Sequence, residues 1–203
     1  KGDTLKYAFI YGIFADKKPG NDEFEDTLKK LNLGGGSEGY PVKMEKGKFI
    51  DGVFFFTAEA NKNEAIFTLG PQKMIIDLPI RVKGIEDNGT AAVFASYRPW
   101  FRFVSVYDNT AYFQEPIEKE NKIWVGNIFV SDNKNIKITV VIDGQDEGKA
   151  PFIEIHNPTE KEIKTNIYSP ANTPIFAGMS FEVVIPAGDS KFYVIKDAKI
   201  MEK

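Results

Sequence analysis

The chain has 203 residues with a net charge of −3, and 42% of them are hydrophobic, which is typical of one large or two small folded domains. The negative net charge argues against a nucleic-acid-binding protein, which needs a basic surface to displace counterions from phosphate. Cysteine is absent and there is one histidine, which excludes disulfides, thiolate or multi-histidine metal sites and cysteine nucleophiles and leaves little room for a Ser-His-Asp triad.

Short runs of β-branched and aromatic residues, separated by Gly, Pro, Asn and Asp, predict a chain built from strands. Several runs alternate in polarity, such as Ile136, Ile138, Val140 and Ile142, which favours antiparallel sheets with one face in water. We expect strands at residues 4–14, 40–44, 48–59, 64–69, 73–83, 90–97, 100–107, 110–114, 122–131, 135–143, 151–157, 161–169, 179–186 and 190–197.

One helix is predicted at residues 21–32, between the first two strands. Asp22 or its neighbour Asn21 can cap its N-terminus, acidic residues fill the first turns, and Lys29 and Lys30 lie at its end, as the helix dipole favours. Phe24, Leu28 and Leu31 form an apolar stripe that can pack on a sheet.

The turns between the strands have ordinary chemistry. Asp87-Asn88-Gly89 and Asp108-Asn109 suit tight hairpins that need positive φ, and Pro186–Asp189 ends one strand and opens the next. Runs that are apolar on both faces, such as Phe54–Phe56, indicate central strands or strands covered by a second layer.

The best domain boundary is Glu115–Asn121, where Pro116 and several charges interrupt the strands. We therefore expect an all-β protein with two antiparallel β-sandwich units, Ig-like or jelly-roll-like, at residues 1–116 and 117–203. The helix belongs to the first unit. A second candidate boundary is Gly144–Pro151, and a single larger sandwich is the alternative architecture.

Two turn motifs in the C-terminal third resemble a known family. The segment Phe152–Ile163 places an Asn157-Pro158-Thr159 turn between two strands, and Val183–Ser190 joins a strand to a Pro-Ala-Gly turn. Both resemble recurring elements of Ig-like β-sandwich modules in bacterial extracellular carbohydrate-active and surface proteins. The resemblance implies an Ig-like fold and an extracellular or cell-surface location, but it implies no site residues, since the motifs are turns.

The segment Tyr97–Phe103 is the main candidate for ligand binding. Pro99 favours an edge strand, which would leave Trp100 exposed for stacking on a sugar ring, with Tyr97 in support and Arg98 bonding hydroxyls. Trp124, together with Tyr112, is a second candidate platform. The competing explanation is that these aromatic residues pack in the core.

Acidic residues suggest two further kinds of site. Asp143, Asp146 and Glu147 lie in a glycine-containing loop whose oxygen atoms could bind calcium, and a solvated turn is the competing explanation. Glu59 and Asp77 fall within apolar strands and would suit carboxylate catalysis if buried, or would simply be strand-end, outward-facing acids. We expect no other cofactor.

These observations lead to three hypotheses. We expect a non-catalytic ancillary or carbohydrate-binding module of a secreted polysaccharide-active protein, whose partners are polysaccharide or other domains of the same polypeptide, with no nucleic acid and no membrane span. The alternatives are a structural or adhesive surface module and a carboxylate-dependent glycoside hydrolase or polysaccharide lyase. The start at Lys1 suggests a mature or excised fragment, and richness in Lys, Glu and Ile suggests a thermophilic bacterial source.

Overall fold

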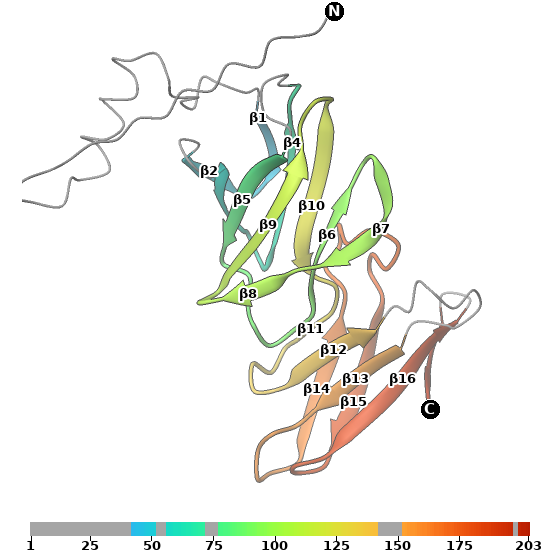
Figure 1. Ribbon diagram of the computed structural model, residues 1–203. Helices are drawn as coiled ribbons and strands as arrows, with labels where there is room; N and C mark the ends of the chain where they lie inside the picture. Colours follow the sequence, from blue (N-terminus) through green and yellow to red (C-terminus); the bar gives the residue numbers. More distant parts are fainter. Residues whose placement is uncertain (1–41, 52–55, 72–76, 142–151, 197–198) are drawn as a thin grey trace, which may run out of the picture.

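The computed structural model describes residues 42–51, 56–71, 77–141, 152–196 and 199–203, and every regular element in these ranges is a β-strand (Figure 1). The all-β prediction is therefore confirmed. The helix predicted at 21–32 and the strand predicted at 4–14 lie outside the described residues.

Ten of the described strands form the first sandwich, in two sheets of five strands each (Figure 1). Sheet A has the order β1 (Val42–Lys46), β4 (Glu64–Leu69), β10 (Asn121–Asn127), β6 (Ala91–Ala95) and β7 (Arg98–Phe103). Sheet B has the order β2 (Lys48–Asp51), β3 (Phe56–Glu59), β5 (Asp77–Lys83), β9 (Thr110–Pro116) and β8 (Ser105–Tyr107). Neighbouring strands are antiparallel except β3 and β5, which are parallel.

The remaining seven strands form a second, smaller sandwich. Sheet C has the order β11 (Val130–Ser131), β14 (Ile163–Tyr168) and β15 (Ser180–Ile185). Sheet D has the order β12 (Lys137–Val141), β13 (Phe152–His156), β16 (Ser190–Lys196) and β17 (Lys199–Glu202). All pairings in these two sheets are antiparallel.

Alternating side chains build the two cores. In β12, Ile138 and Val140 are buried while Lys137 and Thr139 are exposed, as the period-two pattern predicts. The first core lies between sheets A and B and includes Phe56, Phe67, Leu69, Ile80, Val82, Phe113 and Ile123. The second lies between sheets C and D and includes Ile138, Ile153, Ile155, Ile167, Val183, Ile185 and Ile195.

The predicted domain boundary at 116/117 needs correction. It assigned the strand at 122–131 to the C-terminal unit, but β10 lies in the middle of sheet A, paired with β4 on one side and β6 on the other. The chain passes to the second sandwich only after Asn127, at β11. The charges and Pro116 that suggested a linker instead mark the connection from sheet B back to sheet A.

The two hairpin predictions have different outcomes. Asp108 and Asn109 have φ values of 49° and 51° and join β8 directly to β9, so the predicted two-residue hairpin with positive φ is confirmed. Asp87-Asn88-Gly89 also forms a turn, but it connects β5 of sheet B to β6 of sheet A. It is therefore a crossover between layers and not a hairpin.

The two turns behind the family resemblance are joined by one side chain. Asn157 is fully buried, and its Nδ2 donates to the carbonyl oxygens of Lys161 (2.8 Å), Ile185 (3.1 Å) and Pro186 (3.0 Å). Its Oδ1 accepts from the backbone N–H of Thr159 (3.0 Å) and from the Thr159 hydroxyl (2.7 Å). Both motifs thus belong to one hydrogen-bond network, which holds β14 and β15 together at this end of the sandwich.

The second core continues onto the outer face of sheet A. Phe176, from the connection between β14 and β15, stacks on Phe101 of β7 with ring centroids 5.8 Å apart. It also contacts Phe129 at 5.7 Å, and Phe101 meets Trp124 of β10 edge-on at 5.9 Å. Sheet A is therefore covered on both faces near this junction, which explains why β10 is buried on both sides.

Candidate functional site

The most exposed tryptophan lies on β7, an edge strand of sheet A. After β7 the chain passes through Val104 and enters β8, the edge strand of sheet B, so β7 runs along the open side of the first sandwich (Figure 1). Trp100 is 61% exposed, whereas its neighbour Phe101 packs at the junction. The proline at position 99 lies on an edge strand, as its missing N–H requires.

Two arginines on either side of Trp100 hold one buried carboxylate. Nη2 of Arg98 lies 3.0 Å from Oε1 of Glu115, and Nη2 of Arg102 lies 2.6 Å from the same oxygen. Arg102 also donates to the carbonyl oxygen of Gln114 at 2.5 Å. Glu115 is fully buried on β9, so these bonds link the edge of sheet A to sheet B.

Tyr97, which directly precedes β7, completes this cluster. Its hydroxyl donates to Oε2 of Glu115 at 2.6 Å, and the Arg98 guanidinium lies over its ring at 5.4 Å. Burial raises the pKa of Tyr97 to about 12, and the hydrogen bond to Glu115 adds to that effect. The phenol is therefore neutral and half of the ring remains exposed. We call Tyr97, Arg98, Trp100 and Arg102 the β7 platform.

Of the three ligand-binding residues predicted in this segment, the structure leaves two accessible and one engaged in an ion pair. Trp100 and Tyr97 are exposed enough to meet a ligand, whereas Arg98 is buried and its Nη2 is occupied by Glu115. Arg102 and Glu115 were missed as site residues. Arg102 could have been found from its position two residues after Trp100, because alternate residues of a regular strand share a side. No sequence pattern pointed to Glu115, because the charges around Pro116 predicted a linker there.

Trp124 and Tyr112 do not form a second platform. Trp124 is 4% exposed and packs at the junction on the outer face of sheet A, while Tyr112 lies on β9 of sheet B. The two rings thus belong to different layers. The face of Trp124 that a sugar would need is covered by other side chains.

Glu64, the other fully buried glutamate in these strands, links the two sandwiches. Oε2 accepts from Nε1 of Trp124 at 2.9 Å, and Oε1 accepts from Nδ2 of Asn172 at 3.0 Å and forms an ion pair with Lys46. Asn172 belongs to the connection between β14 and β15, so this carboxylate joins β4 of the first sandwich to the second. No part of the sequence distinguished Glu64 from the other acids.

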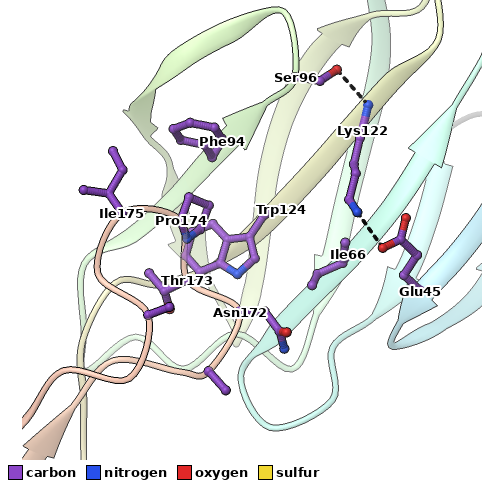
Figure 2. Close-up of a pocket in the computed structure, with 12 residues that line it drawn as sticks. Glu45, Ile66, Phe94, Ser96, Lys122, Trp124, Asn172, Thr173, Pro174 and Ile175 are labelled. Carbon is purple, nitrogen blue, oxygen red and sulfur yellow. Dashed lines mark hydrogen bonds and ion pairs between the residues drawn. The ribbon is translucent and has the colours of Figure 1, made fainter.

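A groove of about 620 Å³ lies at the same junction (Figure 2). Ile66, Phe94 and Trp124 line it from the outer face of sheet A, and residues 171–175 form the opposite wall. Its charged groups are paired with each other, since Nζ of Lys122 lies 2.6 Å from a carboxylate oxygen of Glu45. The groove is mainly apolar.

Neither the two acids expected from the sequence nor the two fully buried glutamates among the described residues fit the role of a catalytic pair. Glu59 and Asp77 are exposed, as expected of strand-end, outward-facing acids. The two buried glutamates are each already bonded to a cation and to further donors, so neither presents a free carboxyl to a glycosidic bond.

The predicted calcium loop, with Asp143, Asp146 and Glu147, lies outside the described residues. Within the ranges that the structure describes, no three acidic or histidine side chains are arranged to hold a metal ion. Calcium binding by residues 143–147 stays a prediction, which a thermal-shift titration with Ca²⁺ and with EGTA would test.

Nor do the described ranges contain a helix of the length and hydropathy needed to span a bilayer. No protein-family model matches this sequence, and no curated protein shows significant similarity to it.

Proposed function

We propose that this protein is a non-catalytic, carbohydrate-binding β-sandwich module of an extracellular polysaccharide-active protein, and that the β7 platform is its ligand-binding surface. The observation that carries the proposal is the position of Trp100, whose ring is 61% exposed on a strand that is anchored on both sides of it. The resemblance of the Asn157 and Pro186 turns to bacterial Ig-like modules supports the extracellular assignment.

A sugar-binding aromatic residue must be both exposed and fixed. A pyranose ring buries its apolar face on an aromatic ring, and the gain is small if the side chain or strand must first be ordered. The bonds of Arg98 and Arg102 to Glu115 hold β7 against β9 before any ligand arrives. Preorganisation of this kind is what a shallow binding surface needs.

The experiment is retention of the protein on insoluble polysaccharides, compared between wild type and Trp100→Ala. We expect the substitution to abolish retention and to leave the melting temperature unchanged, because an exposed ring contributes little to the core. Tyr107→Ala is the matched control, since Tyr107 is an exposed aromatic residue on β8, the next strand along the chain. Unchanged retention in Trp100→Ala, or a large loss of stability, would contradict the proposal.

A second candidate function is a structural module that spaces other domains. It is favoured by the junction, where Phe101, Phe129 and Phe176 pack together and Asn172 bonds to Glu64. Contacts of this kind fix two sandwiches in one orientation. Self-association in light scattering, combined with no binding on a glycan array, would favour this function over carbohydrate binding.

A further inference from the structure

The two guanidinium groups on either side of Trp100 in the sequence share a single carboxylate. Arg98 and Arg102 both bond to the same oxygen of Glu115, and the other oxygen accepts from Tyr97. The phenol of Tyr97 is neutral, so the cluster keeps one uncompensated positive charge. The charged groups that act on that phenol are Glu115, Arg98 and Arg102, with no second acid among them.

The same cluster contains hydrogen-bond donors that have no acceptor. Nε of Arg98 and Nε of Arg102 are both buried and lack a hydrogen-bond partner. Arg102 uses only Nη2 in its bonds to Glu115 and Gln114, and 39% of its side chain is exposed. A surplus cation in a partly buried site is costly, and an anion supplied by a ligand would reduce that cost.

The two arginines flank the exposed Trp100 along β7. Arg98 pairs with Ala95 and Arg102 with Val93 of β6, so both arginines lie on one side of the strand, and the register shift between these two pairs places Trp100 in the irregular stretch between them. A ligand that stacks on Trp100 therefore has a guanidinium within reach along the strand. Arg102 is the accessible one of the two, since Arg98 is buried.

We propose that the β7 platform binds an anionic polysaccharide, with a sugar ring stacked on Trp100 and the acidic group of the sugar paired with Arg102. The inference rests on the proposed carbohydrate-binding function and adds the ligand class. Guanidinium groups form short, charge-assisted bonds to both carboxylates and sulfate esters. The shared chemistry is thus an acidic sugar, and the two sources are separated by experiment.

The test is affinity electrophoresis in native gels that contain one soluble polymer each. Polygalacturonate carries carboxylates, and its highly methyl-esterified form has the same backbone with those charges removed. Dextran sulfate and dextran form a second matched pair for sulfate esters. We expect binding to at least one acidic polymer to be about tenfold tighter than to its neutral partner, and to weaken as salt is added.

Three variants assign the contacts. Trp100→Ala should abolish retardation by the acidic polymer. Arg102→Gln should remove most of the preference for it over the neutral partner, and Arg102→Lys, which keeps the charge and loses the planar fork, should retain part of that preference. Lys134→Gln is the matched control, since it removes one exposed positive charge from the second sandwich and should change nothing.

The outcomes separate this inference from the proposed function. Equal binding to the acidic and neutral partners would overturn the anionic ligand and leave carbohydrate binding in place. An acidic preference that persists in Arg102→Gln would overturn the assignment to this site. No binding to any of the four polymers would overturn the inference, and the polysaccharide retention experiment would then decide the proposed function by itself.

Discussion

Glu115 is the residue on which the shape of the β7 platform depends. It accepts bonds from three side chains of the 97–102 segment while being fully buried, so it holds two arginines that would otherwise be unpaired. Removing one member of a buried ion pair is far more costly than removing an exposed pair.

We therefore expect Glu115→Gln to lower the free energy of unfolding by about 2–4 kcal/mol, somewhat less than for a fully buried pair because Arg102 is partly exposed. Urea denaturation measures the change. Glu182→Gln is the control, since Glu182 forms an exposed ion pair with Lys164, and its effect should stay within about 0.5 kcal/mol. Equal effects of the two substitutions would contradict this account.

Tyr97 gives the cluster a pH dependence at alkaline pH. Its pKa is about 12 in the folded chain against 10.0 for an ordinary tyrosine, chiefly because of burial and then because of Glu115. The folded state thus holds this proton more tightly than the unfolded state does. The resulting stability is fully present below about pH 10 and is lost as the pH rises through about 12.

The measurement compares wild type with Tyr97→Phe by denaturation at a series of pH values. We expect the difference in stability between them to be constant below about pH 10 and to shift against the wild type toward pH 12. The other tyrosines and the lysines titrate in both proteins and cancel in the difference. A difference that is flat over the whole range would contradict the assignment.

Ile175 has a positive φ, a backbone conformation that β-branched residues rarely adopt. Its φ is 68°, it lies at the centre of a tight turn closed by a 2.7 Å bond from the Phe176 N–H to the Pro174 carbonyl oxygen, and its side chain is 70% exposed. A β-branched residue with positive φ is strained. The turn nevertheless lets Phe176 enter the junction.

We expect Ile175→Gly to raise the free energy of unfolding by about 0.5–1 kcal/mol, because relief of strain exceeds the entropy that glycine adds to the unfolded chain. Thermal denaturation measures it. Val184→Gly in β15, which lacks positive φ and is also partly exposed, should do the opposite. Destabilisation in both variants would show that the turn carries no strain.

At the scale of elements, short turns were predicted best. The hairpin at Asp108-Asn109 depends only on two residues that tolerate positive φ and on the two strands that they join. Residues 87–89 carry the same chemistry, but whether a turn makes a hairpin or a crossover depends on which sheet the next strand enters. The strand β17, which pairs with β16, was missed because Lys199–Glu202 is short and half charged.

Asn157 joins the turn before β14 to the turn after β15. Asn157→Ala would leave the carbonyl oxygens of Lys161, Ile185 and Pro186 without this donor, and the bond to Ile185 is buried. We expect a loss of about 2–4 kcal/mol in the free energy of unfolding, measured by urea denaturation. Asn133→Ala, which removes one side-chain bond to the N–H of Asn135, should cost about 1 kcal/mol or less.

At the scale of the whole molecule, the two sandwiches share part of a core. Phe176 contacts Phe101 and Phe129, and the second core includes Ala92 and Trp124 from sheet A. A shared core couples the unfolding of its parts, so we expect the wild type to unfold in one cooperative transition.

Phe176→Ala should remove that coupling. We expect a loss of about 3–5 kcal/mol and a separate, earlier transition of the smaller sandwich, which scanning calorimetry would resolve. Phe192→Ala on β16 is the control, because that residue is 42% exposed and lies outside the shared core, so the variant should keep a single transition. A single transition in Phe176→Ala would mean that other contacts, such as Asn172 to Glu64, couple the units by themselves.

The sequence by itself determined most of the described strands, the sandwich class and the Asp108-Asn109 hairpin, because alternation and turn chemistry act over a few residues. It left open whether Trp100 is exposed or packed in the core, and the structure decided for exposure. Tertiary structure decided that β10 belongs to sheet A, that Trp124 is buried, and that Glu64 and Glu115 are the two glutamates buried in ion pairs. The physical reason is distance along the chain. Glu115 meets Arg98 across 17 residues and Asn172 meets Glu64 across 108, and no local pattern encodes which distant strands will share a sheet or a core.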